Sequence, residues 1–184
     1  MIWFTSDLHF GHDREFIWGP RGFKSVKEMN DTILKNWWDT VGFYDDIYVL
    51  GDLMLGDPAN IQLVHSLKGN IHIIRGNHDT NARMELYKKC GNVVEVTEGQ
   101  YLKVNGQNFY LCHYPTFTSN LENGAPLKEH VLNLYGHTHQ QTNFYKDIPF
   151  MYHVGLDSHN CYPVSIERIL EDIKTKAKEC KEFL

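Results

Sequence analysis

The sequence predicts an α/β fold in one domain spanning residues 1–184: a two-sheet β-sandwich flanked by helices. Two observations predict it. In the first half of the chain, short apolar runs alternate with segments of helical periodicity, as in β-α-β units. In the second half, short strands follow one another with turn residues between them, which favours a second sheet facing the first. A chain of 184 residues fits one domain and can bury a core without disulfides.

The first half of the chain supplies the alternating elements. Apolar residues recur at helical spacing in the segment 25–39, and Pro58 suits the first turn of a helix. The strands expected here are residues 2–5, 46–50 and 71–75, and the helices are residues 25–39, 58–67 and 80–90.

The second half supplies mainly strands. The turn signal Asn105-Gly106 predicts that the strands on either side of it form a hairpin. The expected strands are residues 93–96, 100–104, 108–112, 132–135 and 149–154, and a closing helix covers residues 165–180.

The bulk composition limits the function classes. Hydrophobic content of 42% and charged content of 22% are typical of soluble globular proteins. The net charge of −5 argues against a long nucleic acid as partner, because such binding normally needs a basic face. The four cysteines lack C-x-x-C spacing, and the chain shows no signal peptide or membrane-spanning run. We therefore expect reduced thiols, a cytoplasmic location and no membrane partner.

Polar clusters follow several expected strands, and they contain many of the chain's 11 histidines. Ligands in layered α/β folds bind beyond the carboxyl ends of the strands, so these clusters are expected to converge. The candidate metal-binding residues are Asp7, His9, Asp52, Asn77, His113, His137 and His139.

The spacing and chemistry of these residues suit a metal site. Asp7 and His9 are two residues apart, so an extended segment would point both to one side, and His137 and His139 repeat this pattern. Oxygen and imidazole donors without cysteine favour Mn, Fe or Zn. Each cluster alone also fits an ordinary structural role; Asp52, for example, could form a turn or cap a helix.

The cluster Gly76-Asn77-His78-Asp79 is the most specific. Asn77 offers an amide oxygen, whereas His78 should project differently and could act on a substrate. Asp79 could hold an imidazole in one tautomer, as carboxylates near metal sites do. An Asx turn leading into a helix is the alternative.

Taken together, the clusters resemble the motifs of calcineurin-like metallophosphoesterases, in the same order. Those motifs are Ser6-Asp7-Leu8-His9, Gly51-Asp52, Gly76-Asn77-His78-Asp79, His113 and Gly136-His137-Thr138-His139. Three further stretches resemble a small bacterial and phage branch of that family; they are residues 7–12, residues 20–38, and residues 153–157 with 163–165. The resemblance implies a β-sandwich flanked by helices.

The resemblance also implies a reaction and residue roles. It implies hydrolysis of phosphoesters by a hydroxide that bridges two divalent or transition-metal ions, with manganese favoured. The first ion would be held by Asp7, His9, Asp52 and His139, and the second by Asp52, Asn77, His113 and His137. His78 would be the catalytic histidine and Asp79 would orient it. Phe10 departs from the pattern, because many relatives have glycine there.

The substrate is less constrained by the sequence. We expect a small phosphodiester or phosphomonoester, with a nuclease or a non-catalytic metal-binding scaffold as alternatives. His12 and Arg21 could reach a substrate phosphate, or they could be ordinary loop and surface residues. Four aromatic residues could line a wall beside a nucleobase, although most aromatic residues should belong to the core: Trp18, Phe23, Tyr114 and Phe117.

Overall fold

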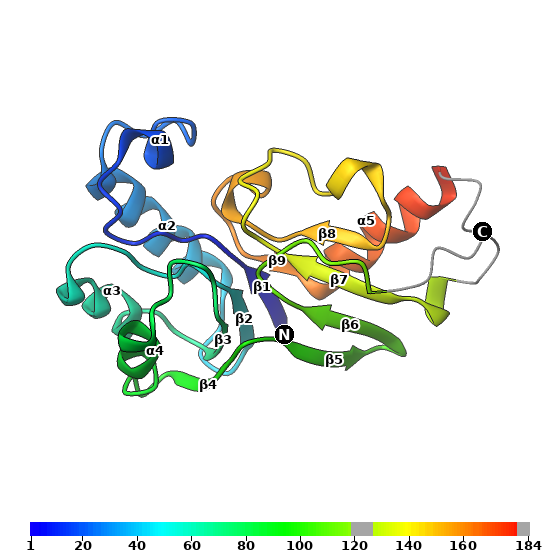
Figure 1. Ribbon diagram of the computed structural model, residues 1–184, viewed down its shortest axis with the longest axis horizontal. Coiled ribbons are helices and arrows are strands. Elements are labelled where there is room, and N and C mark those ends of the chain that lie inside the picture. Colours follow the sequence, from blue (N-terminus) through cyan, green and yellow to red (C-terminus); the bar gives the residue numbers. More distant parts are fainter. Residues whose placement is uncertain (119–126, 180–184) are drawn as a thin grey trace.

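The computed structural model describes residues 1–118 and 127–179, and its strands form two sheets (Figure 1). The five-stranded sheet has the order β4-β3-β2-β1-β9. Its strands are β1 (Ile2–Thr5), β2 (Asp46–Leu50), β3 (Asn70–Ile74), β4 (Val93–Thr97) and β9 (Val164–Ser165). The four-stranded sheet has the order β5-β6-β7-β8. Its strands are β5 (Gln100–Val104), β6 (Gln107–Leu111), β7 (Val131–Tyr135) and β8 (Met151–His153).

Helices cover the sheets, so the predicted two-sheet α/β fold is confirmed. They are α1 (Glu15–Trp18), α2 (Val26–Thr40), α3 (Ile61–His65), α4 (Asn81–Tyr87) and α5 (Ile166–Glu179). One hydrophobic cluster joins the first sheet to the helices of the N-terminal half, with Met29, Ile33 and Trp37 of α2 buried in it. A second cluster lies between the two sheets and α5. None of the helices in the described parts of the chain is long and apolar enough to span a bilayer.

The predicted hairpin is confirmed, whereas other details of the second half differ from expectation. β5 and β6 pair antiparallel, and the turn residues Asn105 and Gly106 have φ angles of 51° and 80°. These left-handed values belong to the tight turns that Asn-Gly favours. The following strands are not hairpins: β6, β7 and β8 pair in parallel. The predicted closing helix reaches Glu179, and Cys180 lies outside the described residues.

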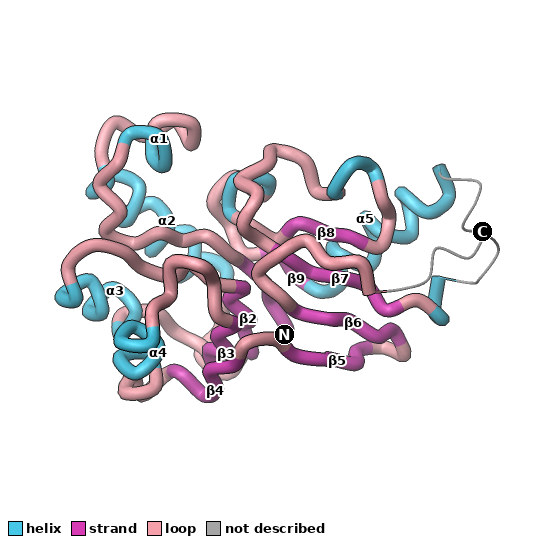
Figure 2. The backbone as a smooth tube through the Cα atoms, in the orientation of Figure 1, coloured by secondary structure: helices cyan, strands magenta, loops and turns pink. Residues whose placement is uncertain are grey.

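The parallel pairing decides where the strand-end loops meet. β1, β2 and β3 run parallel, so their carboxyl ends share one edge of the first sheet. β6 and β7 also run parallel and share an edge of the second sheet. Figure 2 shows loop segments, in pink, beyond these strand ends in the middle of the molecule, where the two sheets adjoin. The polar clusters of the sequence lie on these loops.

Candidate metal centre

Main-chain hydrogen bonds hold the strand-end loops together beyond the strands themselves. The amide of Asp7 donates to the carbonyl oxygen of Gly51 at 3.0 Å, and the amide of His9 donates to Asp52 at 2.9 Å. On the second sheet, the amide of Gly136 donates to His113 at 3.0 Å. Neighbouring strand ends therefore continue as paired loops, which fixes the polar residues relative to one another.

The backbone of the candidate ligands is unusual. Positive φ angles occur at Asp7 (59°), His9 (50°), Asp52 (55°), His137 (68°) and His139 (48°). This left-handed region costs a residue with a side chain about 1–2 kcal/mol. The extended geometry expected for Asp7 to His9 and for His137 to His139 is therefore wrong. Their side chains converge because the backbone turns sharply at each of them.

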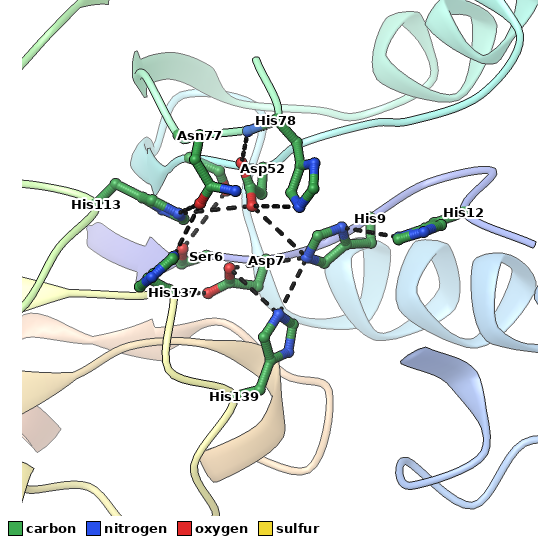
Figure 3. A network of polar contacts seen from close by, with 12 residues as sticks. Ser6, Asp7, His9, His12, Asp52, Asn77, His78, His113, His137 and His139 are labelled. Atoms are coloured by element: carbon green, nitrogen blue, oxygen red, sulfur yellow. Dashed lines mark hydrogen bonds and ion pairs between the residues drawn. The ribbon is translucent and has the colours of Figure 1, made fainter. Parts of the chain in front are cut away.

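One group of donors surrounds Asp7 (Figure 3). The Nε2 atoms of His9 and His139 lie 3.2 Å apart, and each is 3.8 Å from Asp7 Oδ1. Asp52 Oδ2 is also 3.8 Å from the His9 Nε2 atom. Asp7, His9 and His139 thus offer ligand atoms that all lie within 4.8 Å of one another.

A second group of donors surrounds Asn77 (Figure 3). Its Oδ1 atom lies 2.9 Å from His113 Nε2 and 2.8 Å from His137 Nδ1. Asp52 Oδ2 is 3.5 Å from His113 Nε2, and the same oxygen approaches His9 in the first group. The structure therefore brings all seven predicted residues together, and Asp52 lies between the two groups.

The donors in this centre fit a bound cation. Asp7 Oδ1 is buried and has no hydrogen-bond partner among the described residues. An unpaired buried carboxylate oxygen is costly, and a cation would satisfy it. Burial raises the pKa of Asp7, and burial together with the neighbouring His139 lowers the pKa of His9 to about 2. A neutral imidazole is the form that binds a metal.

Three glycines make room for these donors. A Cβ atom added at Gly136 would lie 1.9 Å from Ser6 Oγ and 2.5 Å from Asp7 Oδ2. At Gly51 it would lie 2.5 Å from His113 Nδ1. At Gly76 it would lie 2.2 Å from Asp52 Oδ1. Any side chain at these positions would displace a candidate ligand, so glycine is required for the close approach. At Gly51 the φ angle of 94° also favours glycine.

His78 and Asp79 have different environments. The His78 side chain is 43% exposed, and its Nε2 atom lies 4.0 Å from Asp52 Oδ2. Asp79 is buried and accepts hydrogen bonds from the amides of Asp52 (2.7 Å) and Gly76 (2.9 Å) and from the hydroxyl of Tyr87 (2.8 Å). The expectation that Asp79 orients His78 is thus corrected, because both of its oxygens are used to hold the loops.

His12 and two exposed aromatic rings flank the centre. His12 Nδ1 lies 3.4 Å from His9 Nδ1, and the His12 ring is 6.1 Å from that of His78. The ring of Phe16, which is 69% exposed, packs edge-on against His12. On the other group of donors, the ring of Tyr114 is 46% exposed and lies 4.8 Å from that of His137. Planar apolar surface is therefore available beside each donor group.

Arg21 is not placed as the sequence suggested. Its side chain is only 1% exposed, and its guanidinium donates to the carboxylate of Asp157 through Nε (3.0 Å) and Nη2 (2.9 Å). Nη2 also donates to the carbonyl oxygen of Asp7 at 2.7 Å. A substrate contact by Arg21 is therefore corrected to a buried structural role. Its donors are already used, and no water-exposed face of the guanidinium remains.

Asp157 is a residue near the centre to which the sequence assigned no role. Its Oδ2 atom lies 2.9 Å from His139 Nδ1. Burial acts to raise the pKa of Asp157, but the bonds to His139 and Arg21 outweigh it and hold that pKa below its usual range. Burial likewise acts to lower the pKa of His139, but Asp157 and Asp7 raise it. The stretch 153–157, which resembles the bacterial and phage branch, was the available signal.

The fold and the polar residues at its strand ends match a superfamily of phosphoesterases. The calcineurin-like phosphoesterase superfamily domain matches residues 1–155, and the chain belongs to this superfamily. An uncharacterised protein of Methanocaldococcus jannaschii is 32% identical, covering 94% of this chain and 91% of its own length. The Gene 66 protein of Mycobacterium phage D29 is 30% identical, covering 94% of this chain and 97% of its own length.

Solved structures show the same fold. A protein of unknown function from Aquifex aeolicus superposes with a TM-score of 0.70 at 21% identity, covering 93% of this chain and 98% of that one. Yfce, a phosphoesterase from E. coli, superposes with a TM-score of 0.50 at 18% identity, covering 84% of this chain and 77% of that one.

Proposed function

We propose that this protein is a metal-dependent phosphoesterase that hydrolyses small phosphodiesters or phosphomonoesters. The observation that carries this proposal is the convergence of the seven residues into two adjoining donor groups, one of which contains the Asp7 Oδ1 atom that lacks a hydrogen-bond partner among the described residues. Two divalent or transition-metal ions would bind. The oxygen and imidazole donors suit Mn, Fe or Zn, and the family resemblance favours manganese. The residues for the first ion are Asp7, His9, Asp52 and His139, and those for the second are Asp52, Asn77, His113 and His137.

The reaction divides between the bound metal and the protein's own side chains. Bound metal ions activate water at neutral pH and neutralise phosphoryl oxygens. His78 lies beside Asp52, is partly exposed and carries no bond that fixes its ring to Asp79. It would donate a proton to the leaving oxygen, a role worth about 10²–10⁴-fold in rate. The backbone amide of His78 donates to Asp52 Oδ1 at 2.8 Å, which holds this loop against the shared carboxylate.

The surroundings of the centre favour a small substrate. The net charge of −5 provides no general attraction for a polyanion. The exposed rings of Phe16 and Tyr114 could contact a planar leaving group such as an aryl or nucleoside moiety. Cyclic nucleotides and aryl phosphodiesters are therefore the proposed substrate class. His12, within reach of His9 and His78, is the proposed polar contact for the phosphate.

A substrate panel tests the proposal. Protein loaded with Mn²⁺ is assayed on an aryl phosphodiester, a 2′,3′-cyclic nucleotide, a phosphomonoester and a plasmid, with Asp52→Asn as the matched inactive control. We expect turnover of the small esters, loss of turnover with chelator, and recovery on adding metal back. Plasmid cleavage without small-ester hydrolysis would favour a nuclease. Metal binding without turnover of any substrate would favour a scaffold, and full activity without metal would overturn the proposal.

A further inference from the structure

A buried ion pair lies directly behind the first group of donors. The Arg21 and Asp157 side chains are 1% and 4% exposed, and two parallel hydrogen bonds of 3.0 and 2.9 Å join them. This fork geometry requires a guanidinium, because a lysine ammonium cannot make both bonds in one plane. Because both side chains are buried, water has almost no access to either charge. The remaining contacts of Arg21 and Asp157 indicate which residues this ion pair holds in place.

The pair contacts two candidate ligands at once. Asp157 Oδ2 accepts a hydrogen bond from His139 Nδ1 at 2.9 Å. That bond places the ring hydrogen on Nδ1 and leaves Nε2 free to face His9 Nε2 and Asp7 Oδ1. On the other side, Arg21 Nη2 donates to the carbonyl oxygen of Asp7 at 2.7 Å. One ion pair thus links the loops of β1 and β7 that carry Asp7 and His139.

Both of these ligands need support from outside their own loops. Asp7 and His139 have φ angles of 59° and 48°, a conformation that a residue with a side chain keeps only when its surroundings fix it. Arg21 holds the Asp7 carbonyl in that conformation, and Asp157 fixes the rotation of the His139 ring. Within the described parts of the chain, the second group of donors, at Asn77, His113 and His137, makes no hydrogen bond to either residue of the pair.

From this geometry we infer that Arg21 and Asp157 are positioning residues for the first metal site, which select the His139 tautomer and fix Asp7 opposite it. The inference rests on the proposed function, because it assumes that these donors bind metal. Partners of this kind are typically worth about 10–100-fold in metal affinity. The effect should fall on one of two binding steps, because the second donor group does not depend on the pair.

Asp157→Asn and Arg21→Lys test the inference, with calorimetric Mn²⁺ titration as the readout. In Asp157→Asn, one carboxylate oxygen becomes an NH₂ group, which cannot accept a hydrogen bond, so the side chain can no longer accept all three bonds from Arg21 and His139. We expect one binding step to weaken by about 10–100-fold and the other to stay at its wild-type value. Arg21→Lys keeps the charge but loses the fork, so a smaller loss at the same step is expected.

A matched pair on α5 provides the control. Arg168 Nε donates to Asp172 Oδ1 at 2.9 Å, and both residues lie outside the centre. Arg168→Lys and Asp172→Asn should leave both binding steps unchanged. Thermal unfolding of all four variants reports structural damage, which would weaken both steps together.

The ring tautomer separates this inference from the proposed function. In metal-free wild-type protein, the ¹⁵N shifts of His139 should show hydrogen on Nδ1, and in Asp157→Asn they should show a mixture of tautomers. Wild-type protein that binds no metal would overturn the proposed function and the metal-site assignment, and the tautomer would still report on the pair. Two wild-type binding steps together with an unchanged tautomer in Asp157→Asn would overturn the positioning role alone.

Discussion

At the residue scale, the candidate centre combines left-handed backbone conformations with buried polar side chains, and the buried Asp7 Oδ1 atom has no hydrogen-bond partner among the described residues. Asp7, His9 and His139 adopt left-handed conformations that cost about 1–2 kcal/mol each. The loop-to-loop bonds from Asp7 to Gly51 and from His9 to Asp52 compensate this cost locally. Strain that is held in place by surrounding bonds is a mark of a preformed site. The candidate ligand atoms therefore lie close together without any bound metal or substrate.

Replacing His78 should separate chemistry from metal binding. His78→Ala removes the proposed proton donor and replaces none of the seven proposed metal-binding residues. Turnover should therefore fall by about 10²-fold or more, while metal content stays near wild type. Activity assays with elemental analysis of the same samples measure both quantities. His65→Ala, on the exposed side of α3, is the matched control and should change neither. Loss of a metal ion in His78→Ala would instead assign His78 as a ligand.

Adding a methyl group at Gly136 should damage the centre. The new Cβ atom would lie 2.5 Å from Asp7 Oδ2 and 1.9 Å from Ser6 Oγ, so the Asp7 carboxylate must move. We expect Gly136→Ala to lose at least one metal ion and to unfold at a lower temperature. Gly91→Ala is the control, because an added Cβ there meets no atom within 4 Å. Normal metal content in Gly136→Ala would contradict the close packing of the ligand loops.

The types of the ligand residues could be predicted from sequence, but their supporting contacts could not. The donor chemistry and the strand-end positions of Asp52 and Asn77 are local properties of the chain. The partners of Arg21, Asp79 and Asp157 are tertiary contacts, and Arg21 and Asp157 are 136 residues apart. Nothing in the local pattern indicates that Arg21 is buried. For the same reason, Asp79 was expected to contact the adjacent His78 and instead contacts a loop from another strand.

At the element scale, the direction of the strands produces the centre. Parallel pairing of β1 with β2 and β3 places three ligand-bearing loops on one edge, and parallel pairing of β6 with β7 adds two more. The β-α-β alternation predicted the first of these arrangements from sequence. For the second half the sequence also predicted that the strand ends converge, but not that the strands are parallel. Successive hairpins were expected there, whereas residues 112–130 and 136–150 connect β6 to β7 and β7 to β8. The strand β9 was also missed, since its two residues are too few to show a pattern.

The cap of α2 gives a stability prediction at this scale. The Ser25 side chain accepts a hydrogen bond from the amide of Glu28 at 3.1 Å, and α2 buries Met29, Ile33 and Trp37 in the first hydrophobic cluster. Ser25→Ala should reduce the free energy of unfolding by about 1 kcal/mol, and Ser25→Gly by only a few tenths. Urea denaturation measures both. Equal stability of wild type and Ser25→Ala would show that the cap bond contributes nothing.

At the scale of the whole molecule, the centre joins the two sheets. Asp7, Asp52 and Asn77 come from loops of the first sheet, and the histidines of the second donor group come from loops of the other. The hydrogen bond from the amide of His137 to Asp7 Oδ2, at 2.9 Å, links the two directly. The buried carboxylates of Asp7 and Asp52, both from the first sheet, lie close to His113 of the second sheet at this junction. A bound metal would therefore stabilise the packing of one sheet against the other.

Metal removal should consequently lower the stability of the whole fold. A ligand that binds only the folded state at 100 times its dissociation constant adds about 2.7 kcal/mol, and in a protein of this size each kcal/mol shifts the unfolding midpoint by about 2–4 °C. The midpoint with saturating Mn²⁺ should thus exceed that with chelator by about 5–10 °C. Circular dichroism melts measure this difference. Asp7→Asn should abolish most of the shift, because the unpartnered Oδ1 atom loses its charge, whereas Gly91→Ala should keep the shift in full. An identical midpoint with and without metal, at concentrations where calorimetry shows binding, would mean that the centre does not couple the two sheets.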